Sequence, residues 1–196
     1  MSRRSNPPLD VDDSSVPELS LVVAAVGDSI TEGSPGLRGW DVWAARRDPR
    51  LEIRNCGIYG QRTDEIAARL DECAHGAHVL IVQGGINDIA QDRPIEDAAA
   101  NLRAMVQRGK QLGLRVAIAD VLPWNNGWPD AEPKIRGLNE LIGEIARDEH
   151  VPLLPFHDTL EDPERPGRMR REWTHEGDHP NEAGYRRLAE VAFRLP

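Results

Sequence analysis

The sequence predicts an α/β protein, a three-layer α/β/α sandwich built on a five-stranded parallel sheet. Five short apolar segments alternate with helix-like segments, as expected when β-α-β units surround a parallel sheet. The chain has 196 residues, of which 39% are hydrophobic, so one domain can bury a full core. Residues 1–17 are polar, contain prolines and show no periodicity. We expect them to be a disordered or loosely attached arm, and residues 18–196 to form a single domain.

The five expected strands are short and mostly aliphatic or β-branched, which is typical of strands buried in a parallel sheet. They are residues 19–26, 51–55, 78–82, 114–121 and 151–154.

The expected helices lie between these strands and carry apolar residues at helical spacing. Pro94 falls in the first turn of one helix, and Gly113 ends it. The helices are residues 37–47, 63–74, 94–112, 132–149 and 181–194.

Charge and composition exclude several classes of function. There are 24 Lys and Arg against 33 Asp and Glu, a net charge of −9, which disfavours non-specific binding to nucleic acid or to an anionic membrane. No apolar run approaches the roughly 18 residues of a membrane span. The N-terminal segment lacks the apolar stretch of a secretory signal, so we expect a cytoplasmic protein. Cys56 and Cys73 are too few for a disulfide framework and lack metal-ligand spacing, so we expect reduced, partly buried thiols.

Candidate functional residues follow the expected strands. In open α/β sheets, ligands bind beyond the carboxyl ends of the strands. Ser29 lies three residues past the first strand, where its hydroxyl could act as a nucleophile with nearby N–H donors. Gly57 and Asn87 follow the next two strands and could supply a backbone and an amide donor. Taken singly, they are more readily interpreted as a helix-capping serine, a turn glycine and a turn asparagine.

His179 is the candidate base. It precedes Pro180, which we expect to start the last helix, and Glu176 lies three residues before it. An acid at that spacing could orient the imidazole as a general base, whereas a lone loop histidine is usually a surface residue.

Together these blocks resemble the SGNH, or GDSL, hydrolase family over residues 19–194. The matching segments are Gly27-Asp28-Ser29, Gly57, Gly85-Ile86-Asn87-Asp88 and Asp178-His179-Pro180-Asn181, in the family's order.

The resemblance implies a flavodoxin-like strand order 2-1-3-4-5 and hydrolysis of carboxylic esters through an acyl-enzyme, without metal or organic cofactor. It implies Ser29 as nucleophile and His179 as general base. The Ser29 N–H, the Gly57 N–H and the Asn87 amide would form the oxyanion hole.

One departure concerns the acid. The family usually has aspartate three residues before the histidine, and here that position is Glu176. Glutamate can fix the histidine tautomer in the same way, so we expect Glu176 to be the acid. Asp178, adjacent to His179, ranks second, and a Ser–His dyad without an acid is the third possibility.

A competing motif spans the same residues. His175 to His179 spell H-E-x-x-H, the zinc-peptidase signature, which requires a helix so that both histidines share one face. Gly177 and Pro180 disfavour a helix there, so we expect no metal site.

The substrate is expected to be a small-molecule ester with a short acyl chain, because no contiguous apolar lining for a long chain can be identified. Acetylated carbohydrates, short aryl or alkyl esters, lysophospholipids and acyl thioesters are the candidates.

The candidate substrate-binding residues are Asp28, Trp124 and Asn125. Trp124 and Trp128 could stack on a sugar or line an acyl pocket, or they could only shield their own loop. The alternative from another class is a catalytically silent ligand-binding relative. The oligomeric state is not predicted.

Overall fold

The computed structural model describes residues 20–33 and 36–196, so the expected arm at 1–17 lies outside the described residues. Its main sheet has five parallel strands in the order β2-β1-β3-β4-β5. This confirms the predicted fold class and strand order. The strands are β1 (Leu21–Gly27), β2 (Leu51–Gly57), β3 (Val79–Val82), β4 (Arg115–Ala119) and β5 (Leu153–Leu154).

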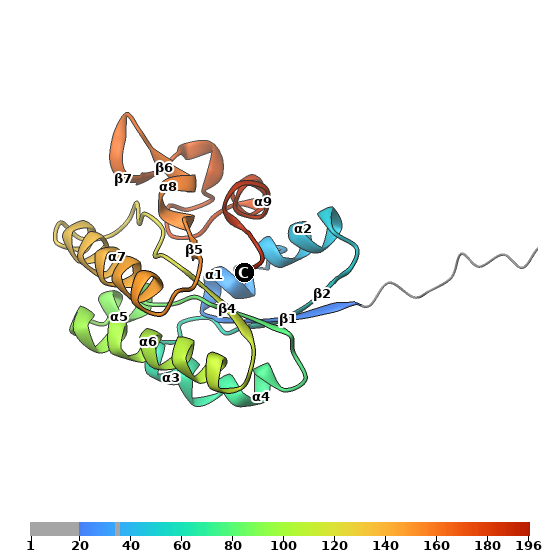
Figure 1. Cartoon of the computed structure of the whole chain (residues 1–196). Helices are drawn as coiled ribbons and strands as arrows, with labels where there is room; N and C mark the ends of the chain where they lie inside the picture. The colour runs from blue at the N-terminus through green and yellow to red at the C-terminus, as the bar shows by residue number, and fades with distance from the viewer. Residues whose placement is uncertain (1–19, 34–35) are drawn as a thin grey trace, which may run out of the picture.

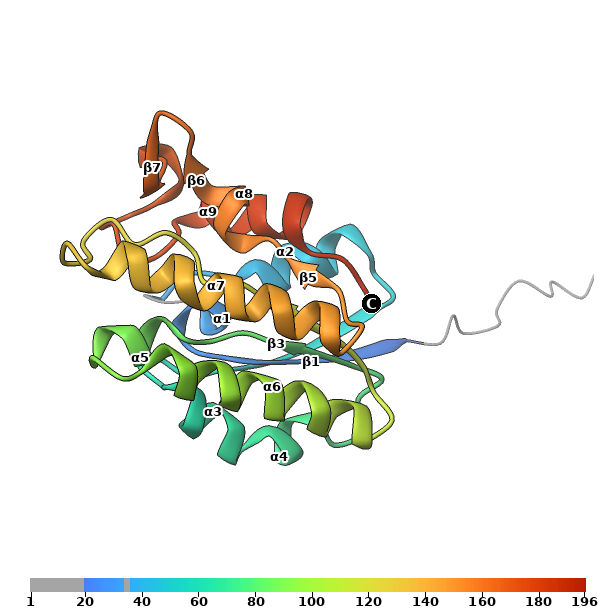
Figure 2. The same ribbon diagram turned by 60° about the vertical axis from the view of Figure 1, so that its left-hand side comes forward.

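Helices cover both faces of the sheet (Figures 1 and 2). On one face α3 (Thr63–Ala68), α4 (Leu70–Ala74), α6 (Ile95–Gln111) and α7 (Ala131–Asp148) pack on the even-numbered residues of β1 and β3. On the other face α2 (Trp40–Arg47), α8 (Phe156–Leu160), α9 (Glu182–Arg187) and η2 (Leu188–Ala192) pack on the odd-numbered residues. The sheet is therefore buried on both sides, which explains its nearly continuous apolar strands.

The two longest helices follow the expected sequence signals. In α6, Pro94 occupies the N-cap position, acidic residues lie in the first turn and basic residues in the last. This charge arrangement stabilises the helix through favourable interactions with its dipole. In α7, Ile135, Leu138, Ile142 and Ile145 form the buried stripe. Both helices end within a residue or two of the expected limits.

Several short elements were not predicted. The expected helix at 63–74 is divided at Arg69 into α3 and α4, and the last helix continues from α9 into the π-helical turn η2. Helices α1 (Ser29–Glu32) and α5 (Ile86–Ala90), together with α8, are one turn long, too short for a periodic signal. Strands β6 (Glu161–Asp162) and β7 (Arg165–Met169) form an antiparallel hairpin, followed by η1 (Arg171–Trp173).

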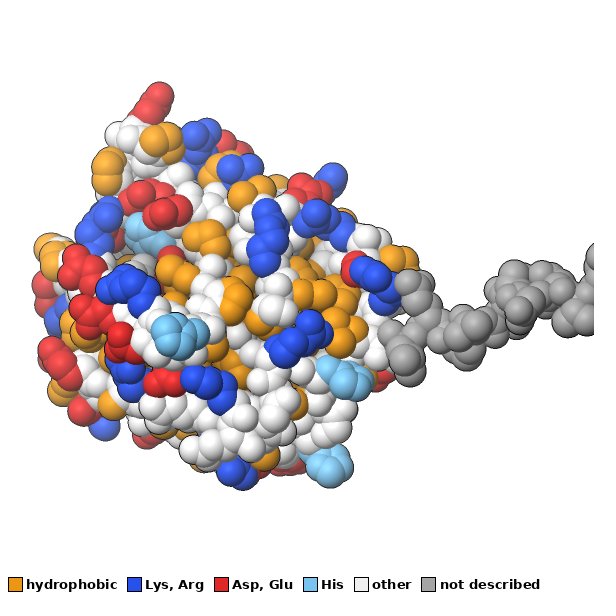
Figure 3. All heavy atoms as spheres, in the orientation of Figure 1, with side chains coloured by type: hydrophobic (Ala, Val, Ile, Leu, Met, Phe, Trp, Pro, Cys, Tyr) orange, Lys and Arg blue, Asp and Glu red, His pale blue; other side chains and the backbone are white. Residues whose placement is uncertain are grey.

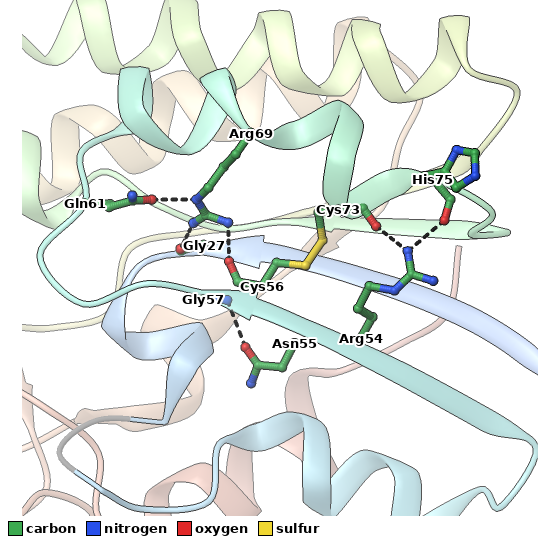
Figure 4. The surroundings of a disulfide bond; sticks show 9 residues. All are labelled: Gly27, Arg54, Asn55, Cys56, Gly57, Gln61, Arg69, Cys73 and His75. Atoms are coloured by element: carbon green, nitrogen blue, oxygen red, sulfur yellow. Dashed lines mark hydrogen bonds between the residues drawn. A yellow bond between two sulfur atoms is a disulfide. The ribbon is translucent and has the colours of Figure 1, made fainter.

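The expectation of reduced thiols is wrong, because Cys56 and Cys73 form a disulfide (Figure 4). The bond joins the end of β2 to α4. The Cα atoms of Cys56 and Cys73 are 6.3 Å apart, within the usual range for disulfides. Structural disulfides are typical of oxidising compartments, so this finding weighs against the cytoplasmic location expected from the N-terminal segment.

The surface carries both signs of charge. On the face in Figure 3, Lys and Arg side chains lie among Asp and Glu side chains rather than in one basic patch. Throughout the described part of the chain, every helix is too short or too polar to cross a membrane.

Candidate active site

Strand β1 ends at Gly27, Asp28 is the N-cap of α1, and Ser29 is the first residue of that helix. The helix begins here because Asp28 caps it: Asp28 Oδ1 accepts a hydrogen bond from the Ile30 N–H at 2.9 Å. Ser29 itself is 4% exposed. Its side chain is thus fixed at the carboxyl edge of the sheet, as the sequence predicted.

His179 and Glu176 complete a hydrogen-bonded line with Ser29. Ser29 Oγ lies 3.0 Å from His179 Nε2, and His179 Nδ1 lies 2.5 Å from Glu176 Oε1. The serine and histidine are 150 positions apart in sequence. The three side chains are arranged as in a catalytic triad, with each ring nitrogen of the histidine bonded to one partner.

Asp178 has a different contact. Its Oδ1 accepts a hydrogen bond from Trp124 Nε1 at 2.7 Å. The geometry therefore favours Glu176 over Asp178 as the partner of His179 Nδ1.

These side chains border a small cavity of about 150 Å³. It is lined by Ser29, Ile30, Tyr59, Ile86, Asn87, Ala90, Trp124, Asp178 and His179. The Tyr59 ring stacks beside the His179 imidazole, with ring centroids 6.0 Å apart, and Tyr59 is 63% exposed. Tyr59, Ile86 and Ala90 were missed in the sequence because nothing separates them there from ordinary loop and core residues.

Asn87 lies on α5 at the end of β3, beside this cavity. One hydrogen of its amide is donated to the Gln61 carbonyl oxygen at 3.0 Å. That bond orients the amide, and the second hydrogen is available to another acceptor. Asn87 therefore lies beside the cavity, and its role as an oxyanion donor stays a prediction.

Gly57 is not brought to the cavity. Its N–H donates to Asn55 Oδ1 at 2.9 Å, and a Cβ on Gly57 would lie 2.0 Å from the backbone N of Glu32. Gly57 is therefore needed for the close packing of β2 on α1, and its N–H is already used. The expectation that it donates to an oxyanion is not supported, because its N–H is bonded to Asn55. Gly57 and Gly60 both lie at the end of this strand or in the loop after it, and spacing in the sequence does not distinguish them.

The candidate substrate-binding residues also differ in placement. Asp28 is fully buried and caps α1, and burial raises its pKa to about 6. It cannot touch a ligand. Asn125 uses its side chain to hold Met169 in the hairpin, donating to the Met169 carbonyl at 3.0 Å and accepting from its N–H at 2.6 Å. Of the three, only Trp124 lines the cavity.

The H-E-x-x-H motif is not a zinc-peptidase site. Residues 174–180 form bends and an isolated bridge rather than a helix, with Gly177 in the left-handed region at φ 99°. Both ring nitrogens of His179 face Ser29 and Glu176 instead.

Buried polar residues behind the site were also missed. Gln83 Oε1 accepts from the Asp28 N–H at 3.2 Å and from Thr31 Oγ1 at 2.8 Å. The Arg69 guanidinium donates to the Gly27, Cys56 and Gln61 oxygens, joining the end of β1 to the end of β2 and the loop after it (Figure 4). The sequence signal that could have found such residues is a polar residue at the end of a buried strand. Gln83 fits that description, and Arg69, which lies between two helices, does not.

Solved structures of similar fold extend over most of the chain. A member of the lipolytic protein G-D-S-L family from Veillonella parvula has a TM-score of 0.78 at 23% identity, covering 90% of this chain and 100% of its own. A GDSL-like lipase from Bacteroides thetaiotaomicron has a TM-score of 0.73 at 23% identity, with 89% and 85% covered. An acetyl-xylooligosaccharide esterase from Geobacillus has a TM-score of 0.73 at 18% identity, with 88% and 93% covered. No curated protein matches the chain significantly.

The family model of GDSL-like lipases and acylhydrolases matches residues 25–187. That range includes the strand-end loops of Ser29 and Asn87 and the segment of Glu176 and His179. The chain belongs to the GDSL-like lipase/acylhydrolase family, and is a hydrolase of that family.

Proposed function

We propose that this chain is a serine esterase that hydrolyses carboxylic esters of short acyl groups through an acyl-enzyme on Ser29. The observation that carries the proposal is the unbroken line from Ser29 Oγ to His179 and Glu176, with distances of 3.0 and 2.5 Å. A ligand-binding relative without turnover would have no need of this alignment, which supports the enzyme over the silent alternative.

In the proposed reaction, His179 Nε2 takes the Ser29 hydroxyl proton as Oγ attacks the ester carbonyl carbon. The bond to the leaving alcohol breaks, and His179 returns the proton to that alcohol. Water then attacks the acyl-enzyme by the same route, releasing the carboxylic acid and restoring Ser29. Glu176 accepts the Nδ1–H throughout, which holds the tautomer and stabilises the imidazolium.

The proposed oxyanion donors are the Ser29 N–H, the free amide hydrogen of Asn87 and the N–H of Gly60. Within the described residues, neither the Ser29 N–H nor the Gly60 N–H has a hydrogen-bond partner. Gly60 follows Tyr59, which lines the cavity, and turns in the left-handed region at φ 76°. It replaces Gly57, whose N–H is occupied.

The size of the cavity supports a short acyl group. Its volume of about 150 Å³ is below the roughly 300–1,000 Å³ of pockets for drug-sized ligands. We therefore expect chains of about two to four carbons to react fastest, because longer chains have no enclosed apolar surface to cover them.

The leaving group would lie over the open rim, where Tyr59 and Trp128 are exposed. Aromatic rings of this kind suit a sugar face, and the Geobacillus neighbour is an acetyl-xylooligosaccharide esterase. An acetylated carbohydrate is accordingly the substrate class we would test beside simple esters.

The test is the turnover of p-nitrophenyl acetate, butyrate and octanoate and of an acetylated xylooligosaccharide. We expect hydrolysis that falls from butyrate to octanoate and is abolished in Ser29→Ala. Faster turnover of octanoate than of acetate would contradict the short-chain assignment. Equal turnover by Ser29→Ala would contradict the proposed nucleophile, and binding of esters without hydrolysis would favour the silent relative.

A further inference from the structure

A second cluster of ionisable side chains lies outside this cavity, where α7, α8 and the β6–β7 hairpin meet. Glu132 lies in the first turn of α7, His157 on α8 and Glu161 at the start of β6. One carboxylate oxygen of each glutamate and a ring nitrogen of His157 all lie within 4.8 Å of one another. No other group of three such ligands occurs in residues 20–33 and 36–196.

The cluster contains buried atoms without hydrogen bonds. His157 is 4% exposed, and its Nε2 is buried without a hydrogen bond. Both carboxylate oxygens of Glu132 are buried and lack hydrogen bonds as well. Leaving the His157 Nε2 buried without a partner costs free energy, so a partner at this position would be favoured.

Arg136 offsets only part of the negative charge. Its Nε lies 2.5 Å from Glu132 Oε1 without hydrogen-bond geometry, and its Nη2 donates to Glu161 Oε1 at 2.8 Å. The Gly167 N–H donates to the same Glu161 oxygen at 2.7 Å. One guanidinium therefore faces two carboxylates, which leaves the cluster able to accept a further cation.

The donor set indicates the chemical class of that cation. Calcium and magnesium prefer oxygen ligands alone, whereas zinc and similar ions take imidazole nitrogen together with carboxylate oxygen. Zinc is held at about 2.0–2.2 Å from such atoms. Donor atoms within 4.8 Å of one another can reach that distance through small side-chain movements.

We propose that Glu132, His157 and Glu161 bind a divalent transition-metal ion, with Zn²⁺ as the best match, in a structural site. Three protein ligands leave the fourth position of a tetrahedral zinc to water, unlike most structural zinc sites, which have four protein ligands; the role is called structural because the ion lies away from Ser29. The reaction proposed for Ser29 does not involve this ion.

The site would fasten the hairpin to the rest of the fold. Met169 of the hairpin is bonded to the Asn125 side chain at 2.6 and 3.0 Å, and the Asn125 N–H donates to Gly177 O at 2.9 Å. The hairpin thus supports the segment that carries His179. An ion at its base should raise thermal stability, while substrate chemistry changes little.

The experiment is calorimetric titration of Zn²⁺ into the full chain after chelator treatment, with thermal unfolding followed in parallel. We expect one ion per chain, a Tm raised by about 5 °C or more in excess Zn²⁺, and affinity reduced at least about tenfold in His157→Gln and in Glu132→Gln. The matched control His75→Gln, an exposed histidine, should bind as the wild type does.

Residues 174–180 are the place where Zn²⁺ could bind instead, since they include His175, Glu176 and His179. X-ray absorption of the zinc-loaded wild type distinguishes the two without any variant: our proposal requires one imidazole ligand, and the competing site two. Failure of the wild type to bind stoichiometric Zn²⁺, two imidazoles in the spectrum, or binding abolished by His175→Gln but retained in His157→Gln would each overturn the proposal.

Discussion

Ser29 and His179 face each other but are held by different kinds of structure. Ser29 follows a central strand, and behind it Asp28, Thr31 and Gln83 form a buried network, each at most 3% exposed. His179 lies on residues 174–180, which contain no helix and only an isolated bridge.

The segment of His179 is held by hydrogen bonds within itself and from the loop that contains Asn126. Thr174 Oγ1 donates to His179 O at 2.8 Å, and Asn126 Nδ2 donates to Glu176 O at 2.6 Å. The position of Ser29 therefore depends on the folded core, whereas that of His179 depends on a few loop contacts. Substitutions behind Ser29 should therefore lower mainly the free energy of unfolding, whereas substitutions at the loop contacts of His179 should lower mainly kcat.

The largest effect is expected where the two regions meet. Ser29→Ala and His179→Ala should each lower kcat by about 10⁴-fold or more, and the double variant should be little worse than either one. The reason is that nucleophile and base act as a unit, so that removing one already abolishes the pathway. Steady-state kinetics on p-nitrophenyl acetate provide the measurement. Losses that multiply in the double variant would show that the two residues act independently.

The acid comes next. Glu176→Gln should cost about 10²–10⁴ in kcat, because an amide favours the wrong histidine tautomer. Glu176→Asp keeps the charge and should retain much of the activity, and Asp178→Asn should cost less than about tenfold, because Asp178 is bonded to Trp124. Thermal unfolding of each variant controls for loss of fold. A severe loss in Asp178→Asn with normal turnover in Glu176→Gln would move the acid to Asp178.

The disulfide tests the core-held region. Cys56→Ser with Cys73→Ser should lower the free energy of unfolding by about 2–4 kcal/mol, because the bond closes a loop of 17 residues. Urea unfolding of oxidised, reduced and double-variant protein measures this. Since the triad residues lie elsewhere, kcat of the folded fraction should change by less than about threefold. Reduced wild-type protein should have the same free energy of unfolding as the double variant. If the oxidised protein were no more stable than either, the stabilising disulfide between Cys56 and Cys73 would be contradicted.

How much the sequence could predict follows the same division. Ser29 and Asn87 lie a few residues past apolar strands, and Glu176 is three residues from His179, so local spacing marked them as candidates and the resemblance to a known family joined them. The contacts of residues 124–126 with 174–178 join positions about 50 apart, and no local pattern encodes that pairing. The disulfide escaped prediction for the same reason.

A milder substitution separates stability from turnover on the Ser29 side. Thr31→Val keeps the shape of a fully buried side chain and removes only its donation to Gln83 Oε1. The free energy of unfolding should fall by about 1 kcal/mol, the typical net contribution of one hydrogen bond, with kcat within about twofold of wild type. Urea unfolding and ester kinetics on the same preparation measure both. A tenfold loss of kcat at unchanged stability would mean that Thr31 sets the position of Ser29 directly.

The smallest expected effect is on the His179 side, and it has the opposite character. Asn126 is exposed, so Asn126→Ala should alter the free energy of unfolding by no more than about 0.5 kcal/mol. It removes the 2.6 Å bond to the Glu176 carbonyl, which should let the acid drift from His179 Nδ1 and lower kcat by about two- to fivefold. KM should change little, because Asn126 does not line the cavity. Gln111→Ala, an exposed residue at the end of α6, is the matched control and should leave both quantities unchanged. A loss of stability without loss of kcat would mean that this loop contact supports the fold rather than the triad, and the distinction between the two regions would not hold.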